Sequence, residues 1–408
     1  MKLILNMVLT VLLLYAAQTG GQAALKVDGK PFFPIGWYTT AGFGSVEEAR
    51  QYLGKQKEQG MNSALICYGI WESDSYMTNA LDAADALGMK VMVEVNRYAL
   101  MEKEGYPLSI IDHQVDLLKD KPAFFSWYLV DEPEVMGVTP VKVQARYVQV
   151  KARDPKHPIA VVHCAGEAQP CHWAEKFLAL EPPPYCDVLM TDTYPVGENT
   201  PEFGSHLWQV AVESKYYTAL AKKHGKQAYF NVVQTHKGGG IRLPTFAEQR
   251  YLSYAPITVG ARGLFYWMRE GGFTTEEQVE KIIAPIARQI ASLVPVIVSD
   301  STKVSVKSSR DADTTGHGVG DVTYLFGEDS HGGYLIAVNN TPNGFSVKFK
   351  LFGKVLKGRC GKSGVAVPVM FEGRTVRAMP GDSSKSWVLK DDFKPFDVNV
   401  YRLYAIGK

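Results

Sequence analysis

The sequence lacks a strong charge of either sign. Its 44 Lys and Arg residues nearly balance its 42 Asp and Glu residues, which leaves a formal net charge of +2, and no Lys/Arg-rich block interrupts the chain. Proteins that bind nucleic acid usually carry a marked positive excess, because contacts with phosphates dominate that interaction. We therefore expect no nucleic-acid partner.

Several catalytic signatures are also missing. The nine histidines are scattered, with no His-x-His pair and no His-Glu-x-x-His motif, and the five cysteines match no zinc spacing. No Gly-rich phosphate loop follows an early apolar run, and no Gly-x-Ser-x-Gly elbow is present. The sequence therefore predicts no metal site and no cofactor.

Long apolar runs are confined to the N-terminus. Lys2 precedes an apolar run over residues 3–17, and small residues follow it up to residue 24. This pattern is typical of a secretory signal peptide, because the run is short for a membrane-spanning helix. We expect residues 1–24 to be removed, a secreted or periplasmic location, and no stable membrane insertion afterwards. A single membrane anchor is the alternative.

What the sequence does contain is a regular alternation of apolar runs with helical patterns. This alternation is typical of a (β/α)8 TIM barrel, and we predict one over residues 25–298. The rival, an open doubly wound sheet, would need the phosphate loop that is missing. The eight apolar runs recur about every thirty residues and cover 33–38, 61–68, 90–95, 124–130, 158–164, 187–194, 227–234 and 261–268.

The spacing of apolar residues that is typical of helices ends near residue 300. Beyond it, residues such as 333–338 and 345–349 alternate apolar and polar side chains, with Gly, Asn, Pro and Asp between the segments. Alternation of this kind indicates antiparallel strands. We therefore predict a β-sandwich accessory domain over residues 299–408, packed on the barrel.

One stretch carries a dense set of acids. Residues 124–130 form an aromatic, apolar run, and Asp131, Glu132 and Glu134 follow it around Pro133. Pro133 cannot donate a backbone hydrogen bond, so the strand should end here. Barrel enzymes hold their catalytic groups at the carboxyl ends of such strands. We therefore place Asp131 and Glu132 at the centre of the site, with solvated loop acids as the alternative.

The other predicted strand ends supply aromatic, acidic and amide side chains and few basic ones. Aromatic rings can stack on the apolar faces of sugars, while carboxylates and amides can bind sugar hydroxyls. This combination predicts a carbohydrate ligand. The residues that we expect around it are Trp37, Tyr38, Glu94, Asp192, Tyr194, Gln234, Trp267 and Glu270.

Four segments resemble one enzyme group, the retaining glycoside hydrolases of the large (β/α)8 clan that includes β-galactosidases, cellulases and mannanases. Residues 127–133, Trp-Tyr-Leu-Val-Asp-Glu-Pro, are similar to the clan's fourth strand, which ends in Asn-Glu-Pro with the Glu as acid/base. Segments 27–38, 192–195 and 263–267 look like its first, sixth and eighth strands. The resemblance covers roughly residues 26–295 and assigns no single family.

The chain departs from that clan in two places. Asp131 stands where the clan has Asn before its acid/base. The clan's nucleophile is a Glu at the end of strand seven, whereas residues 232–236 read Val-Val-Gln-Thr-His. The resemblance thus implies an acid/base but leaves the nucleophile unassigned.

The resemblance implies a secreted glycoside hydrolase with Glu132 as general acid/base. Neighbouring Asp131 should raise the pKa of Glu132 by repulsion between like charges. Glu270 is the first candidate nucleophile and Glu94 the reserve. The remaining strand-end residues are candidate substrate contacts.

Three alternatives stay open. In a substrate-assisted hexosaminidase, Asp131 would orient an acetamido group beside Glu132, and no enzymic nucleophile would be needed. The missing strand-seven acid also fits a carbohydrate-binding barrel without activity. A metal-dependent hydrolase is the third alternative.

Overall fold

The computed structural model describes residues 25–40, 42–165, 172–182, 184–204, 206–269, 271–299, 304–353, 364–382 and 386–405. The predicted signal peptide, residues 1–24, and the candidate nucleophile Glu270 lie outside the described residues. No helix among these described residues is long and apolar enough to cross a membrane.

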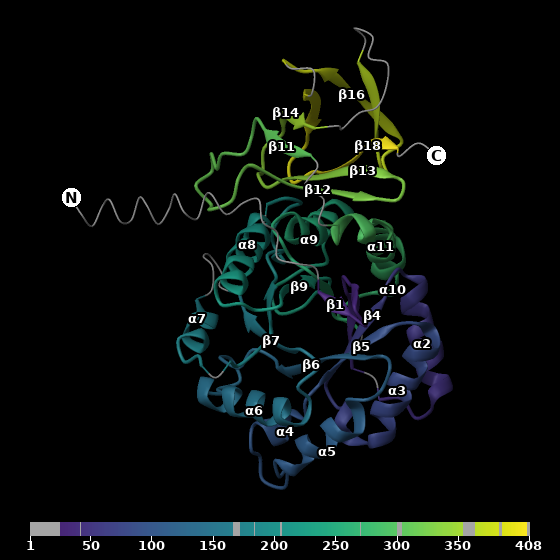
Figure 1. Ribbon diagram of the computed structural model, residues 1–408, viewed down its shortest axis with the longest axis vertical. Coiled ribbons are helices and arrows are strands. Elements are labelled where there is room, and N and C mark those ends of the chain that lie inside the picture. The colour runs from purple at the N-terminus through teal and green to yellow at the C-terminus, as the bar shows by residue number, and fades with distance from the viewer. Residues whose placement is uncertain are drawn as a thin grey trace, which may run out of the picture.

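Eight parallel strands close into a barrel in the order β10-β3-β4-β5-β6-β7-β8-β9 (Figure 1). The barrel prediction is confirmed, and each strand falls on one of the eight apolar runs. The strands are β3 (Ile35–Thr39), β4 (Ser63–Ile66), β5 (Lys90–Glu94), β6 (Phe124–Val130), β7 (Ile159–Cys164), β8 (Val188–Thr193), β9 (Ala228–Gln234) and β10 (Leu264–Trp267).

Helices between the strands form the outer layer of the barrel, and a short hairpin of β1 (Lys26–Val27) and β2 (Lys30–Pro31) precedes β3. The helices are α2 (Val46–Glu58), α3 (Asp74–Leu87), α4 (Arg97–Leu100), α5 (Ser109–Leu118), α6 (Pro140–Arg153), α7 (Trp173–Leu178), α8 (Trp208–Lys223), α9 (Phe246–Thr258), α10 (Glu276–Gln278) and α11 (Ala284–Ile297). A 3-10 turn, Ile70–Glu72, follows β4, and a π-helical turn, Val279–Ile283, joins α10 to α11.

The buried side chains of the barrel strands form two layers, one inside the barrel and one between the strands and the helices. On β8, Val188 and Met190 belong to the cluster inside the barrel, whereas Leu189 packs in the layer between strands and helices. Successive strand residues point to opposite faces, so every second residue reaches the interior. The inward position at the carboxyl end of each strand therefore faces the mouth of the barrel.

The C-terminal domain is one antiparallel sheet of eight strands in the order β11-β14-β17-β16-β15-β18-β13-β12. The predicted two-sheet sandwich is thus replaced by a single continuous sheet, and every strand contributes to one enclosed apolar cluster. The strands are β11 (Ser305–Ser308), β12 (Val322–Asp329), β13 (Gly332–Asn339), β14 (Phe345–Phe352), β15 (Val365–Val369), β16 (Arg374–Pro380), β17 (Ser386–Phe393) and β18 (Val398–Ala405).

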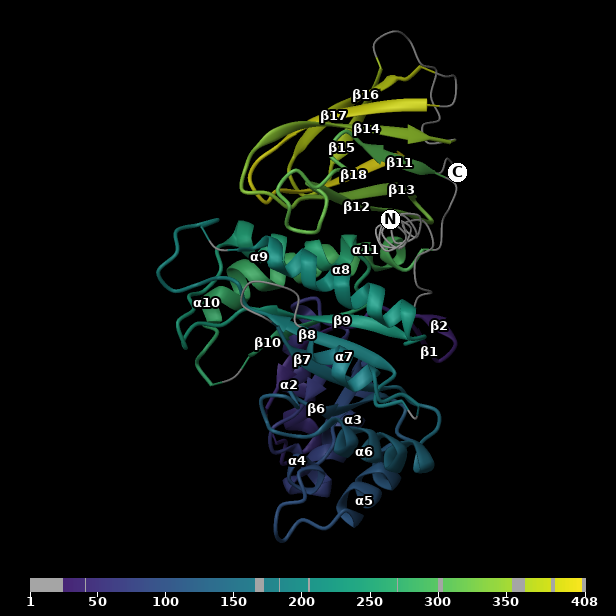
Figure 2. The same ribbon diagram turned by 90° about the vertical axis from the view of Figure 1, so that its left-hand side faces the viewer.

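The sheet lies against the flank of the barrel, over α9 and α11 (Figure 2). Ile336 and Val400, from β13 and β18, are fully buried in the same apolar cluster as the helix layer of the barrel. An ion pair between Arg250 on α9 and Glu372 after β15, at 2.7 Å, links the two parts at the edge. The helices α9 and α11 therefore depend on the sheet to cover their outer faces.

Candidate active site

The acids predicted at the centre of the site follow β6 directly. The backbone N–H of Glu132 donates to the Val162 carbonyl at 3.2 Å, which holds this residue beside the end of β7. Glu132 has φ of 38°, in the left-handed region that residues other than glycine seldom adopt. Such strained backbone tends to occur where the side chain must be aimed for function.

Glu132 shares a hydrogen bond between carboxyl groups with Asp192, which stands at an inward position of β8. Burial raises the pKa of Glu132, and the negative charge of Asp131 raises it further, while the bond from Asp192 opposes both effects. Burial also raises the pKa of Asp192, well above its usual value, and the charge of Glu132 adds to this effect. The second oxygen of Asp192, Oδ1, is buried without a hydrogen-bond partner. These effects together favour the protonated form of the pair.

Asp131 is bound by two phenols. The Tyr128 hydroxyl donates to one of its oxygens at 2.5 Å, the Tyr68 hydroxyl donates to the other, and Arg97 lies 3.8 Å from the same second oxygen. Donors around a carboxylate stabilise its charged form. These donors hold Asp131 in place beside Glu132, and its charge raises the pKa of Glu132, in the direction that the sequence predicted.

Glu94 lies at the inward carboxyl end of β5 and is 1% exposed. It accepts hydrogen bonds from the backbone N–H of Tyr68 at 2.8 Å and from Arg97 Nη2, also at 2.8 Å. Burial raises the pKa of Glu94 to about 7, although Arg97 opposes the shift. Its oxygens are committed to protein partners, so Glu94 is poorly placed as the reserve nucleophile.

An aromatic wall stands at the same mouth. The Trp267 ring meets Tyr38 edge-on at 5.1 Å between centroids and Tyr68 at 5.5 Å, and it lies 6.3 Å from His236. Tyr194 meets His236 edge-on at 4.8 Å. Burial lowers the pKa of His236 to about 4, so this imidazole is neutral at pH 7. Tyr38, Tyr194 and Trp267 therefore gather where the sequence predicted them.

Two predicted contacts lie elsewhere. Trp37 is 0% exposed and packs against Tyr266 in the layer between strands and helices, because it alternates with the inward Tyr38. Gln234 is also fully buried, and its amide bonds both the N–H and the carbonyl of Val196, at 2.9 and 3.1 Å. Trp37 is thus a core residue, and Gln234 fixes the loop after β8.

Two residues of the cluster, Arg97 and Tyr128, were missing from the predicted site, whereas Tyr68 follows β4 at a strand end where the sequence predicts rim residues. Arg97 follows Glu94 by three residues at the start of α4, a spacing that favours an ion pair. Tyr128 lies inside the barrel, as its place on β6 permits. The guanidinium of Arg97 also lies over the Tyr68 ring, 4.4 Å from its centroid.

Two cavities open around this mouth. The first, of about 250 Å³, is lined by residues after β4 and β5, and the second, of about 660 Å³, by residues after β8, β9 and β10. Tyr68, Gly69, Trp71, Glu72, Arg97 and Tyr98 line the first cavity. Glu198, Lys237, Gly238, Ile241, Arg242, Leu243, Gly271, Gly272 and Phe273 line the second.

No protein-family model matches this chain, and no curated protein matches it either. Solved structures do match. A GH30 endoxylanase from Clostridium papyrosolvens C71 has a TM-score of 0.52 at 11% identity, covering 94% of this chain and 97% of that one. A catalytic mutant of Gan42B, a GH42 β-galactosidase from G. stearothermophilus, has a TM-score of 0.55 at 9% identity, covering 90% and 98%.

At identities this low, the likeness concerns the fold alone. The chain has a closed parallel barrel followed by a sheet domain, and the two neighbours match it over nearly their whole lengths. The comparisons therefore show that this chain has the fold of these glycoside hydrolases.

Proposed function

We propose that the protein is a glycoside hydrolase in which Glu132 is the general acid. The observation that carries this proposal is the hydrogen-bonded pair of Glu132 and Asp192 at the carboxyl ends of β6 and β8. General acid catalysis at neutral pH needs a carboxyl group that keeps its proton there. Burial and the charge of Asp131 favour that condition, because both raise the pKa of Glu132.

The substrate is a carbohydrate, with Trp267 as the proposed platform for one sugar ring and Tyr38 and Tyr194 beside it. Glu132 donates its proton to the leaving glycosidic oxygen. The ionised Glu132 then takes a proton from the water that releases the sugar, which restores its carboxyl group, while the shared hydrogen bond with Asp192 holds Glu132 in place. Asp131, held by Tyr68 and Tyr128, attracts the positive charge that develops on the sugar.

Glycoside cleavage with two carboxylates needs a spacing of roughly 5–5.5 Å for retention or roughly 6.5–9.5 Å for inversion. Asp192 cannot meet either spacing in this arrangement, because carboxyl groups joined by a hydrogen bond bring their oxygens to roughly 2.5–2.7 Å. Glu94 is engaged by Arg97. Glu270, which follows β10 beyond the described residues, is therefore our proposed nucleophile.

A specific observation also favours substrate assistance as a second candidate. The described strands β9 and β10, on the far side of the mouth from Glu132, carry no carboxylate, whereas Asp131 adjoins Glu132. In this variant Asp131 or Asp192 would orient an acetamido group of the substrate. Hydrolysis of N-acetylhexosaminides that persists in a Glu270→Gln variant would support it.

The test is to assay purified protein against a panel of xylans, mannans, galactosides and N-acetylhexosaminides, and to measure the release of reducing ends. We expect activity on at least one class, and Glu132→Gln should abolish it while Asp74→Asn, which changes an exposed acid outside both cavities, should retain it. Absence of hydrolysis together with tight binding would instead support a binding barrel. Secretion stays a prediction that rests on residues 1–24.

A further inference from the structure

The two cavities lie on opposite sides of the barrel mouth. Strand order places β4 and β5, which border the first cavity, across the barrel from β8 and β9, which border the second cavity together with β10. Glu132 follows β6, which lies between these two groups of strands, and its partner Asp192 is on β8, at the edge of the second group. A chain-like ligand that reached both cavities would therefore pass the acid pair.

The first cavity offers aromatic surface beside compensated charge. Trp71 and Tyr98 meet edge-on at 5.9 Å between centroids, and both line the cavity. Arg97, its cationic group, forms an ion pair with Glu94 at 2.8 Å. Because that positive charge is already compensated, the cavity suits a neutral polar ligand with an apolar face better than an anion.

The second cavity has an exposed aromatic platform. Phe273 is 45% exposed, and its carbonyl accepts a hydrogen bond from the backbone N–H of Lys237 at 3.0 Å. Gly238 and Gly271, with φ of 107° and 77°, allow the two loops to turn beside this ring. Glu198 and Lys237 add charges of opposite sign, so this cavity also has no strong preference for an ion.

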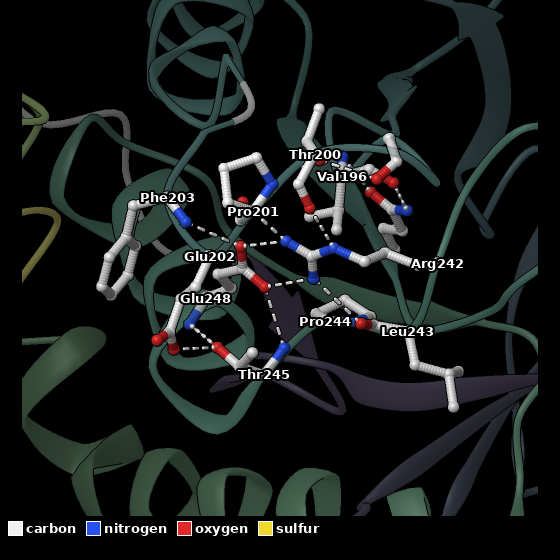
Figure 3. Close-up of polar contacts among 12 residues, drawn as sticks. Val196, Thr200, Pro201, Glu202, Phe203, Arg242, Leu243, Pro244, Thr245 and Glu248 are labelled. Carbon is white, nitrogen blue, oxygen red and sulfur yellow. Dashed lines mark hydrogen bonds and ion pairs between the residues drawn. The ribbon is translucent and has the colours of Figure 1, made fainter.

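Arg242, which lines the second cavity, is held by a network of hydrogen bonds (Figure 3). The Arg242 guanidinium donates to both oxygens of Glu248 at 2.7 Å, and to the carbonyls of Thr200 at 2.9 Å and Pro201 at 3.1 Å. These bonds join the loop after β8 to the start of α9. A ligand would therefore meet a rigid surface, which reduces the entropy lost on binding.

A continuous set of rings connects the two cavities. Tyr68 lines the first cavity and contacts Trp267, which in turn lies beside His236. Lys237, the next residue after His236, lines the second cavity. Apolar ring surface thus extends along the mouth between the cavities, on the side that faces Glu132 across the barrel.

We propose that the two cavities hold the two ends of one neutral carbohydrate chain, so that the bond presented to Glu132 lies inside the chain. This inference rests on the proposed function and deepens it, because it assigns internal cleavage of an oligo- or polysaccharide. Trp71 and Phe273 are the proposed stacking platforms at the two ends.

Binding tests the two platforms without relying on turnover. Affinity for xylo-, manno- and cello-oligosaccharides of increasing length should be measured by calorimetry in the Glu132→Gln background. Phe273→Ala and Trp71→Ala should each weaken binding of the longer ligands by about fivefold or more, and leave the disaccharides nearly unchanged. The controls are Phe246→Ala and Trp173→Ala, which remove comparably exposed rings, 41% and 37%, outside both cavities.

Trp71 also packs against the core, so Trp71→Phe replaces the alanine variant if thermal unfolding shows that the latter does not fold. Equal losses for short and long ligands, or equal losses in the controls, would overturn the proposal. So would the absence of binding by every ligand in the series.

Product analysis separates this inference from the proposed function. With oligosaccharides labelled at the reducing end, we expect labelled fragments of intermediate length to appear first. Release of only terminal monosaccharides would overturn internal cleavage and leave the hydrolase proposal standing. Absence of any hydrolysis would contradict the proposed function, and the binding series would then still decide whether one chain spans both cavities.

Discussion

At the scale of single residues, the chemistry of the site depends on which of the two carboxyl groups, Asp192 or Glu132, carries the proton. The two half-buried carboxyl groups lie side by side, and the charge of Asp131 raises the pKa of both, so removal of the last proton from the pair is unfavourable. The same low-dielectric surroundings that raise these pKa values also strengthen the interaction of Asp131 with a developing positive charge.

Asp192→Asn should move the basic limb of the kcat/KM profile to lower pH. An asparagine amide donates to the Glu132 carboxylate and carries no charge, and both changes favour ionised Glu132. The measurement is the pH dependence of hydrolysis, with Asp74→Asn, an exposed acid on α3, as the control. A basic limb that stays in place would show that Asp192 does not influence the pKa of Glu132.

His236 should make the fold sensitive to mild acid. Burial lowers the pKa of His236 from 6.5 to about 4, so the unfolded chain binds more protons between these values. The stability linked to neutral His236 is complete above about pH 6.5 and is lost as the pH falls toward 4, by up to about 3 kcal/mol.

Urea unfolding of the parent protein and of His236→Asn at pH 7 and near pH 4.5 measures this effect. The variant should lose less stability than the parent over this interval, because asparagine does not titrate. His331→Asn, which replaces an exposed histidine of the C-terminal domain, is the control. An identical pH dependence in the parent and His236→Asn would contradict the assignment.

The residues that the sequence placed correctly are those whose direction follows from a strand end. Asp131 and Glu132 directly follow a buried run, and Asp192 occupies the inward position of β8. Trp37 and Gln234 show where prediction from the sequence fails. Neighbours on a strand point to opposite faces, so Trp37 and Tyr38 cannot both face the mouth, and sequence alone does not reveal that a loop carbonyl and N–H occupy the Gln234 amide.

At the scale of elements, the loops after β8 and β9 depend on one buried carboxylate. Glu248 is 0% exposed, and besides Arg242 it accepts backbone N–H groups of Phe203 at 3.0 Å and Thr245 at 2.9 Å. Thr245 and Glu248 also form the capping box that begins α9. This network fixes the start of α9 against the wall of the second cavity.

Arg242→Gln should lower the free energy of unfolding by about 3 kcal/mol, because it leaves the buried charge of Glu248 without its partner. Denaturant unfolding measures the loss. Arg50→Gln is the matched control, since Arg50 forms an exposed pair with Glu47 and should contribute less than about 1 kcal/mol. Similar losses in the two variants would indicate that the Arg242 pair contributes no more than a surface contact.

The strand and helix pattern was predictable at this scale because each apolar run recurs with the barrel period. The arrangement of the strands in the C-terminal domain was less predictable from the sequence. Alternating residues give the face of each strand, but they do not reveal whether two groups of strands separate into facing sheets or stay joined through β16 and β17.

At the scale of the whole molecule, the barrel and the C-terminal sheet share a core. Because Ile336 is fully buried against the helix layer of the barrel, Ile336→Ala should destabilise both parts, by about 2–5 kcal/mol. Calorimetry should show one cooperative transition that moves to lower temperature. Phe352→Ala, at an exposed position of β14, should change it little. Two transitions, of which only that of the C-terminal domain moves, would contradict a shared core.

The central claim, that Glu132 protonates the leaving oxygen, is tested most directly by the dependence of Glu132→Gln on the leaving group. For a glycoside with a poor leaving group, this variant should lower kcat by about 10²–10⁴-fold, the usual contribution of general acid catalysis. For a dinitrophenyl glycoside of the same sugar, whose leaving group departs without protonation, the loss should be much smaller. A near-normal rate on the poor leaving group, or equal losses on both, would contradict the role of Glu132.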